Sequence, residues 1–215
     1  MKNKIKKFTK ENKKPKKTYH HGDLKGTLIE AAKLMIKKDG IESLTMRNIS
    51  KLAGVSHAAA YRHFKDKEEL LAELAIDGYK ELIIILDKFF LKEDKDLAKN
   101  YLEVGLDYIQ FALSNAEVYR IMWGKDKVDS NKFKELKSIS EQSFSLKYRI
   151  IKVVYKNCNY DEKHLNYIAL SEWAQIHGFA MLLIDGVISF KDTPFVDPEF
   201  LLQNFTLNDL IHKRK

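Results

Sequence analysis

Cysteine, proline and glycine are scarce in this 215-residue sequence, which contains one, three and nine of them respectively. The single Cys158 has no partner for an internal disulfide, as is typical of proteins of the reducing cytosol. Because proline and glycine interrupt helices most strongly, their scarcity leaves most of the chain free to be helical. No apolar run reaches the roughly 18 residues of a membrane span, and the basic N-terminus lacks the apolar stretch of a secretion signal. We therefore expect a soluble, cytoplasmic protein with no membrane partner.

The residue patterns of common catalytic and metal sites are also missing. The sequence has no glycine-rich phosphate loop, no Cys-x-x-Cys pair and no His-x-x-x-His pair. His164 and His177 lie too far apart on one predicted helix to share a metal ion, and Cys158 has no activating neighbour in sequence. These absences predict a protein that is not an enzyme and needs no metal or cofactor, and they leave a small-molecule effector open.

Positive charge is concentrated at the N-terminus. Residues 1–17 contain nine lysines and one glutamate, residues 18–64 have a net charge of +3, and the remainder has a net charge of −3. We expect residues 1–18 to be a disordered basic arm, and its charge is typical of a protein with a polyanionic partner. Nucleic acid and an anionic membrane surface both attract such an arm, and a solvated tail that only aids solubility has the same composition.

Apolar residues recur with helical spacing through most of the chain. The pattern predicts helices over residues 24–39, 46–53, 57–64, 66–90, 97–113, 116–123, 136–157, 161–184 and 198–211. Residues 82–86 would also suit a buried strand, but their flanks are helical in pattern and carry no turn signals. The sequence therefore predicts an all-α fold of about nine helices. A three-helix N-terminal domain is expected over residues 19–66, or to about 82 with the start of the fourth helix, followed by a larger helical bundle over residues 83–215.

Residues 45–64 are the most informative segment. Thr45 and Ser56 have N-cap positions on two short helices, and Gly54 between them supplies the positive φ of a tight turn. The side chains expected to lock the two helices together are Ile49, Val55, Ala60 and Phe64. Residues 56–59 then remain exposed at the start of the second helix, the end that enters the major groove in helix-turn-helix proteins.

This segment resembles the N-terminal signature of TetR-type repressors. The matching residues are Thr45, Ile49, Ala53-Gly54-Val55-Ser56, Tyr61, His63-Phe64, Lys67 and Leu70. The lead-in over residues 19–24 resembles that of one branch of the family, and Trp173, His177 and Gly178 have the spacing of that branch's Trp-His-Gly type C-terminal domain. The resemblance covers roughly residues 19–211 and implies a DNA-binding transcriptional regulator.

The resemblance also implies roles for individual residues. Those expected to hold the DNA backbone are Thr45, Arg47, Ser56, Tyr61, Arg62, His63 and Lys67. The candidate base readers are His57, Ala58 and Ala59, with Arg62 a further candidate for a guanine edge. Because alanine offers only apolar contact, direct readout is expected to be sparse and DNA shape to contribute. The lysine-rich arm either tracks the minor groove or raises non-specific affinity.

The helix predicted over residues 161–184 becomes apolar almost all round after Trp173. A helix with two apolar faces must bury both, so we expect one face against its own core and the other against a second copy of the chain. Gly178 would permit close approach at this contact, and the last predicted helix would complete a four-helix interface. A two-fold dimer in turn predicts two half-sites on a roughly palindromic operator.

In related regulators the C-terminal body encloses a ligand pocket, and the resemblance implies one here. The candidate pocket residues are Tyr101, Tyr108, Phe111, Met122, Trp123, Trp173 and His177, although aromatic residues at helical spacing equally suit a plain core. The leading hypothesis is a ligand-responsive repressor that binds double-stranded operator DNA as a homodimer. A transcriptional activator of the same fold, and a helical adaptor that uses its basic arm on membrane or nucleic acid, are the alternatives.

Overall fold

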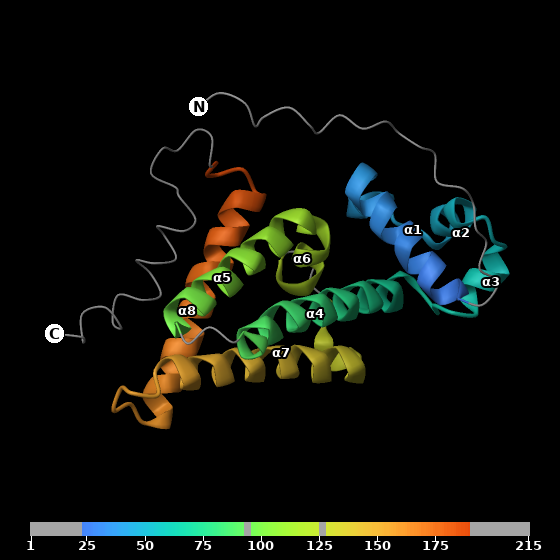
Figure 1. The fold of residues 1–215 in the computed structure, drawn as a ribbon. Helices are drawn as coiled ribbons and strands as arrows, with labels where there is room; N and C mark the ends of the chain where they lie inside the picture. The colour runs from blue at the N-terminus through green and yellow to red at the C-terminus, as the bar shows by residue number, and fades with distance from the viewer. Residues whose placement is uncertain (1–22, 93–95, 125–127, 190–215) are drawn as a thin grey trace.

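The computed structural model describes residues 23–92, 96–124 and 128–189. Over these residues the chain forms eight α-helices and two short 3-10 helices, η1 and η2, and no strand (Figure 1). The elements are α1 (Leu24–Asp39), η1 (Ile41–Ser43), α2 (Met46–Ala53), α3 (His57–Tyr61), α4 (Lys67–Leu91), α5 (Leu97–Ser114), α6 (Ala116–Trp123), η2 (Ser130–Lys132), α7 (Lys134–Val154) and α8 (Glu162–Ile184).

The predicted all-α fold is confirmed, and residues 82–86 are helical. The basic arm and the helix predicted over residues 198–211 lie outside the described residues. None of the helices described is long and apolar enough to cross a membrane.

A short polar residue occupies the N-cap position of most of these helices. In each case the residue before the helix accepts a hydrogen bond from the backbone N–H three residues ahead, which satisfies a donor that the helix itself leaves unpaired. The capping residues are Asp23, Thr45, Ser56, Asp66, Asp96 and Asp161. Gly26 leaves room for the first of these caps, because a Cβ at that position would collide with the Asp23 carboxylate.

Two helices end earlier than their apolar periodicity predicts. The predicted helix over residues 57–64 stops at Tyr61, because the N–H groups of His63 and Phe64 both turn back to the Ala60 carbonyl, at 3.0 and 3.1 Å. Phe64 nevertheless reaches the core, where it is 1% exposed. The helix predicted to end at residue 157 stops at Val154 and is followed by a turn in which Cys158 N–H donates to the Tyr155 carbonyl.

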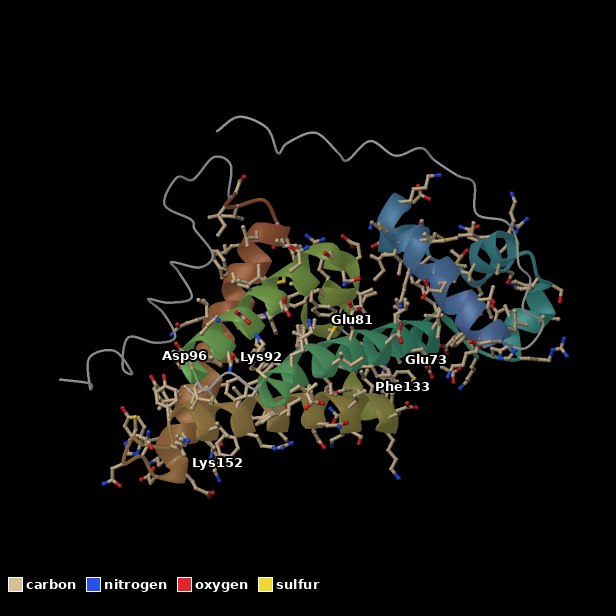
Figure 2. The ribbon with its side chains drawn as sticks, in the orientation of Figure 1. Glu73, Glu81, Lys92, Asp96, Phe133 and Lys152 are labelled. Atoms are coloured by element: carbon tan, nitrogen blue, oxygen red, sulfur yellow. The ribbon has the colours of Figure 1, made fainter. Side chains whose placement is uncertain are left out.

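The long helix α4 joins the N-terminal helices to the C-terminal body. Its start packs against α1, and its remaining length lies against α5, α6 and α7 (Figure 1). The body is completed by α8, which packs against α5 and α7. Glu73 lies at the end of α4 nearer the N-terminal helices, and Lys92 and Asp96 lie at the far end (Figure 2). A single cluster of buried apolar side chains runs from Leu28 in α1 to Ala180 in α8.

Successive faces of one short stretch of α4 contact different neighbours. Glu73 forms an ion pair of 2.6 Å with Lys25, and Asp77 forms a short ion pair with Lys33, so this face is attached to α1. The next face touches α6 at Gly78, where a Cβ would come within 2.6 Å of the Met122 sulfur and 2.8 Å of a Val118 methyl group. The glycine therefore sets how closely α4 and α6 approach.

Candidate functional site

The turn between α2 and α3 has the geometry that the sequence predicts. Gly54 adopts a left-handed conformation with φ 70° and ψ 30°, and its N–H caps the end of α2. The Val55 N–H donates to the Ser50 carbonyl at 3.0 Å, which completes the reversal of the chain. Ile49 and Ala60 are buried and Val55 is half-buried. α2 and α3 therefore form a closed helix-turn-helix pair whose contact residues match the prediction.

The ten predicted DNA-contacting residues lie around this turn and at the start of α4. Eight of them are exposed, namely Thr45, Arg47, Ser56, His57, Ala58, Tyr61, Arg62 and His63. Ala59 and Lys67 are half-buried. The first turn of α3 therefore presents the candidate base readers His57 and Ala58 to solvent, whereas described residues partly cover Ala59.

The two N-cap hydroxyls keep a free hydrogen. Thr45 accepts from the Asn48 N–H at 3.1 Å, and Ser56 accepts from the Ala59 N–H at 3.1 Å. A hydroxyl that accepts a capping bond still has its own O–H to donate, so each can donate to a phosphate oxygen without losing the cap.

The basic side chains divide into paired and unpaired sets. Arg47 and Arg62 are exposed and form no ion pair with any described residue, which leaves both guanidinium groups available to phosphate. Lys67 is different, because its ammonium donates to the Ile41 carbonyl at 3.1 Å and so ties η1 to the start of α4. Substituting Lys67 would disturb the domain as well as any phosphate contact. Sequence reasoning did not single out Lys51 and Lys65, which are also exposed and without an ion pair to any described residue.

His57 and Tyr61 are in contact, with ring centroids 4.7 Å apart at an edge-to-face angle of 77°. A candidate base reader and a candidate backbone contact therefore support one another's orientation on the exposed face of α3.

The C-terminal body contains two cavities that share part of their wall. The smaller, of about 60 Å³, lies among α4, α5, α7 and α8 and is lined in part by Tyr101, Tyr108 and Glu172. The larger, of about 430 Å³, is lined in part by Tyr79, Met122, Trp123, Ser143 and Phe144. Lys147 and Trp173 line both.

The predicted pocket residues are distributed unevenly around these cavities. Tyr101 and Tyr108 line the smaller one, Met122 and Trp123 line the larger one, and Trp173 lines both. Phe111 is a buried core residue whose ring contacts Tyr119, and it lines neither cavity. His177 also lines neither cavity, and its ring contacts those of Tyr119, Trp123 and Trp173.

A chain of hydroxyl groups leads from the smaller cavity to His177. The Tyr108 hydroxyl lies 2.9 Å from the Tyr119 hydroxyl, which in turn lies 2.7 Å from His177 Nδ1. Burial raises the pKa of Tyr108 to about 12, and burial and the neighbouring Tyr108 raise the pKa of Tyr119 further, so both phenols are neutral. Burial and the nearby Lys147 lower the pKa of His177, which favours neutral imidazole.

Lys147 is the most unusual side chain of the body. Its ammonium nitrogen lies 4.6 Å from the ring centroid of Trp173, 5.4 Å from that of Tyr108 and 5.5 Å from that of Trp123. It has no hydrogen bond and no ion pair with a described residue. Although the residue as a whole is only half-buried, desolvation of its ammonium lowers its pKa to about 7, because the aromatic rings replace only part of the lost hydration. Sequence reasoning missed this residue, since Lys147 lies in a Lys-Tyr-Arg run that is typical of a solvated helix face.

Glu172, which sequence reasoning also missed, is held by two tyrosines. Its carboxylate accepts a 2.8 Å hydrogen bond from the Tyr155 hydroxyl and a short one from the Tyr101 hydroxyl. Burial and the neighbouring carboxylate raise the pKa of Tyr101 well above its ordinary value. Glu172 is therefore occupied by phenolic donors, although it faces the same small cavity as Lys147.

One face of α8 carries apolar and small residues that the described residues do not cover. Tyr167, Leu170 and Leu182 are 72%, 52% and 43% exposed, and a Cβ at Gly178 would have no atom within 4 Å. The described residues of a single protomer therefore leave an uncovered face along this helix.

Family comparisons agree with this arrangement of domains. Residues 28–74 match the family model of bacterial regulatory proteins of the tetR family, and residues 101–204 match the tetracyclin repressor-like C-terminal domain. An HTH-type transcriptional regulator of Staphylococcus aureus (strain USA300) is 34% identical over 89 residues, which are 40% of this chain and 46% of the relative. The match therefore spans about half the length of this curated relative.

Solved structures extend the likeness to most of the chain. A protein of unknown function from Rhodococcus sp. RHA1 is 26% identical with a TM-score of 0.74, over 89% of this chain and 96% of that one. A TetR family transcriptional regulator of Thermus thermophilus shares the fold at 20% identity and a TM-score of 0.60, over 87% and 97% of the two chains. The Trp-His-Gly type of C-terminal domain stays a prediction, because the matching domain model is the tetracyclin repressor-like one. The chain belongs to the TetR family of bacterial regulatory proteins.

Proposed function

We propose that this protein is a non-enzymatic transcriptional regulator that binds a specific operator in double-stranded DNA through α2 and α3. The observation that carries the proposal is the open first turn of α3, where His57 and Ala58 are exposed next to a capped, rigid turn. The two unpaired arginines on either side, Arg47 and Arg62, supply the positive charge that positions a duplex backbone.

The proposal includes a homodimer formed through the uncovered face of α8. An apolar stripe that contains an open glycine suits close packing against the same stripe of a second copy. Two such reading heads would require an operator with two half-sites. We further propose that a small molecule in the C-terminal body alters operator affinity. Ala75 and Tyr79 line the larger cavity on the same stretch of α4 that pairs with α1, which supports this coupling.

Selection of bound sites from random DNA by the purified protein tests the proposal. We expect enrichment of one roughly palindromic sequence and retention of that preference when residues 1–17 are removed. Titrations of this site across salt concentration, with and without the arm, separate the alternatives. If the protein without residues 1–17 lacks duplex affinity while the arm binds anionic vesicles, the result would contradict DNA regulation and favour a membrane adaptor.

A further inference from the structure

The larger cavity contains three polar groups for which the described protein provides no partner. The Ser143 hydroxyl is buried in a residue 1% exposed and makes no hydrogen bond. The indole N–H of Trp173 is buried and lies close to the Tyr108 hydroxyl without reaching hydrogen-bond geometry. The Lys147 ammonium makes no hydrogen bond or ion pair with a described residue and lies over the rings of three aromatic side chains. Two buried donors and a half-buried ammonium without acceptors are costly, so their presence in one cavity indicates a site for a group that accepts hydrogen bonds.

These three groups share one wall. Ser143 and Lys147 are four residues apart on α7 and therefore lie on the same helix face. Trp173 reaches them from α8, with its ring 4.6 Å from the Lys147 nitrogen. All three line the larger cavity. A cation, a hydroxyl and an N–H on one wall form a donor set that matches a carboxylate, which accepts several hydrogen bonds and carries the opposite charge.

Much of the remaining wall of the cavity is apolar and aromatic, and Ser130, Ser140, Glu141 and Ser145 complete it. Tyr79, Met122, Trp123, Leu136 and Phe144 contribute to it, and its volume of about 430 Å³ falls in the range of small-molecule sites. An inorganic anion would leave most of this surface uncovered, whereas an organic acid with an apolar body would fill it.

Other titratable groups surround the lysine without neutralising it. Tyr79 of α4, Tyr108 of α5 and Glu141 of α7 face the cavities. From α8, Glu172 lines the smaller cavity and is held by two tyrosines, and His177 is close enough for its charge to oppose that of Lys147. Glu141 is exposed and forms no ion pair with a described residue. No described carboxylate therefore lies within ion-pair distance of the Lys147 ammonium.

We propose that the larger cavity binds an organic carboxylate with an apolar, ring-sized body, its carboxylate held by Lys147, Ser143 and Trp173. The proposal rests on the proposed function, since it names the chemical class of the effector. Neutral molecules of the same shape should bind more weakly because they leave the ammonium unpaired. Organic cations should bind weakest.

Isothermal titration calorimetry of the full chain without DNA tests the proposal. The probes are 2-naphthoate, 4-phenylbutyrate and decanoate, each beside its primary amide, with acetate as the head group alone and 2-naphthylmethylamine as the cation. We expect at least one acid to bind about 10-fold or more tighter than its amide. Binding at pH 8 should take up close to one proton per site, measured in two buffers of different ionisation enthalpy, because the acid raises the lysine pKa.

Variants separate a binding role from a structural one. Lys147→Met should abolish the preference for the acid over its amide and the proton uptake, while Lys147→Arg should retain part of the preference. Lys137→Met, at an exposed position on the same helix, should change neither. Melting curves establish that each variant is folded. Failure of all three acids to bind, equal binding of acids and amides, or tighter binding of the cationic probe would overturn the proposal.

A gel shift with the selected operator keeps the two proposals distinguishable. If the protein binds its operator while no acid binds the cavity, the proposed regulatory function is supported and the proposed effector class is wrong. If an acid binds while operator binding is absent, the cavity is correctly assigned and the proposed regulatory function is wrong.

Discussion

The Tyr119 hydroxyl lies 2.7 Å from His177 Nδ1 and joins α6 to α8. A half-buried imidazole needs a hydrogen-bond partner. The structure supplies a protein partner and continues the chain to Tyr108, 2.9 Å from the same hydroxyl. Trp173 and His177, one turn apart on α8, thus have different surroundings, since the tryptophan lines both cavities and the histidine contacts tyrosine.

Tyr119→Phe should lower the free energy of unfolding by about 1–3 kcal/mol, because it leaves buried polar groups of Tyr108 and His177 without a partner. Denaturant titration measures the change. Tyr61→Phe removes a hydroxyl from a side chain of α3 that is 46% exposed, and it should have little effect on unfolding in the absence of DNA. Equal stability of the Tyr119→Phe protein would show that the hydroxyl chain contributes nothing to the body.

Stability should rise with pH above neutrality through Lys147. The pKa of this lysine is about 7 in the folded protein and near 10.5 when unfolded, so the unfolded chain binds more protons between these values. The free energy of unfolding therefore increases with pH in that window, by at most about 1.4 kcal/mol per pH unit from this group.

Urea titrations from pH 7 to 10 measure this slope. Lys147→Met should be more stable than wild type at pH 7, and its stability should change less across the window. Lys137→Met serves as the control. A Lys147→Met protein with the wild-type slope would mean that the lysine titrates normally.

Gly54→Ala should destabilise the N-terminal domain by about 1–3 kcal/mol, because a residue with a Cβ is strained at φ 70°. Operator affinity should fall in parallel. Gly54→Asn is the matched control, since asparagine tolerates the left-handed region better than alanine does. If alanine and asparagine behave alike in melting and gel-shift experiments, strain at this turn is not the cause.

Gly178→Leu should weaken the dimer while leaving the protomer folded. Among the described residues of the protomer nothing lies within 4 Å of a Cβ at this position, so the side chain meets no obstacle from them. At a close helix contact in a symmetric dimer, the two leucines would keep the helices apart. Sedimentation velocity measures the association, and Ser138→Leu on the exposed face of α7 is the control. An unchanged dimer would place the interface elsewhere.

Tyr61→Phe and His57→Gln should affect DNA binding in different ways. The phenylalanine keeps the ring contact with His57 and removes one phosphate donor, so affinity should fall about 5-fold on every sequence. His57→Gln should instead change which sequences are preferred. Arg62→Ala should reduce the salt dependence of binding by about one counterion. Identical effects of the first two changes across a panel of operators would contradict the division between positioning and reading.

Local chemistry predicted the helix starts well, because each depends on residues close in sequence. Thr45 and Ser56 cap the helices they were expected to cap, and Gly54 adopts its left-handed turn. The predicted end of α3 was wrong because Phe64 continues the apolar spacing of Ala60. A turn that brings Phe64 into the core satisfies that spacing equally well.

The polar wall of the larger cavity could not be predicted from residues close in sequence. Ser143 has the helical spacing of apolar residues such as Leu136, Leu146 and Ile150, but Lys147 has the sequence neighbours of an ordinary surface lysine. Its burial depends on Trp173, which is 26 residues away and on another helix. Only the packing of α7 against α8 and α5 brings these side chains together.

The stretch of α4 over residues 73–79 contacts a different neighbour on each of several faces. Glu73 and Asp77 face α1, Gly78 touches α6, and Ala75 and Tyr79 border the larger cavity. Genetic screens for altered effector response and for altered operator affinity should therefore recover overlapping positions within these two helical turns. If the proposed effector response is correct, substitutions here that change effector specificity during evolution should also change operator affinity.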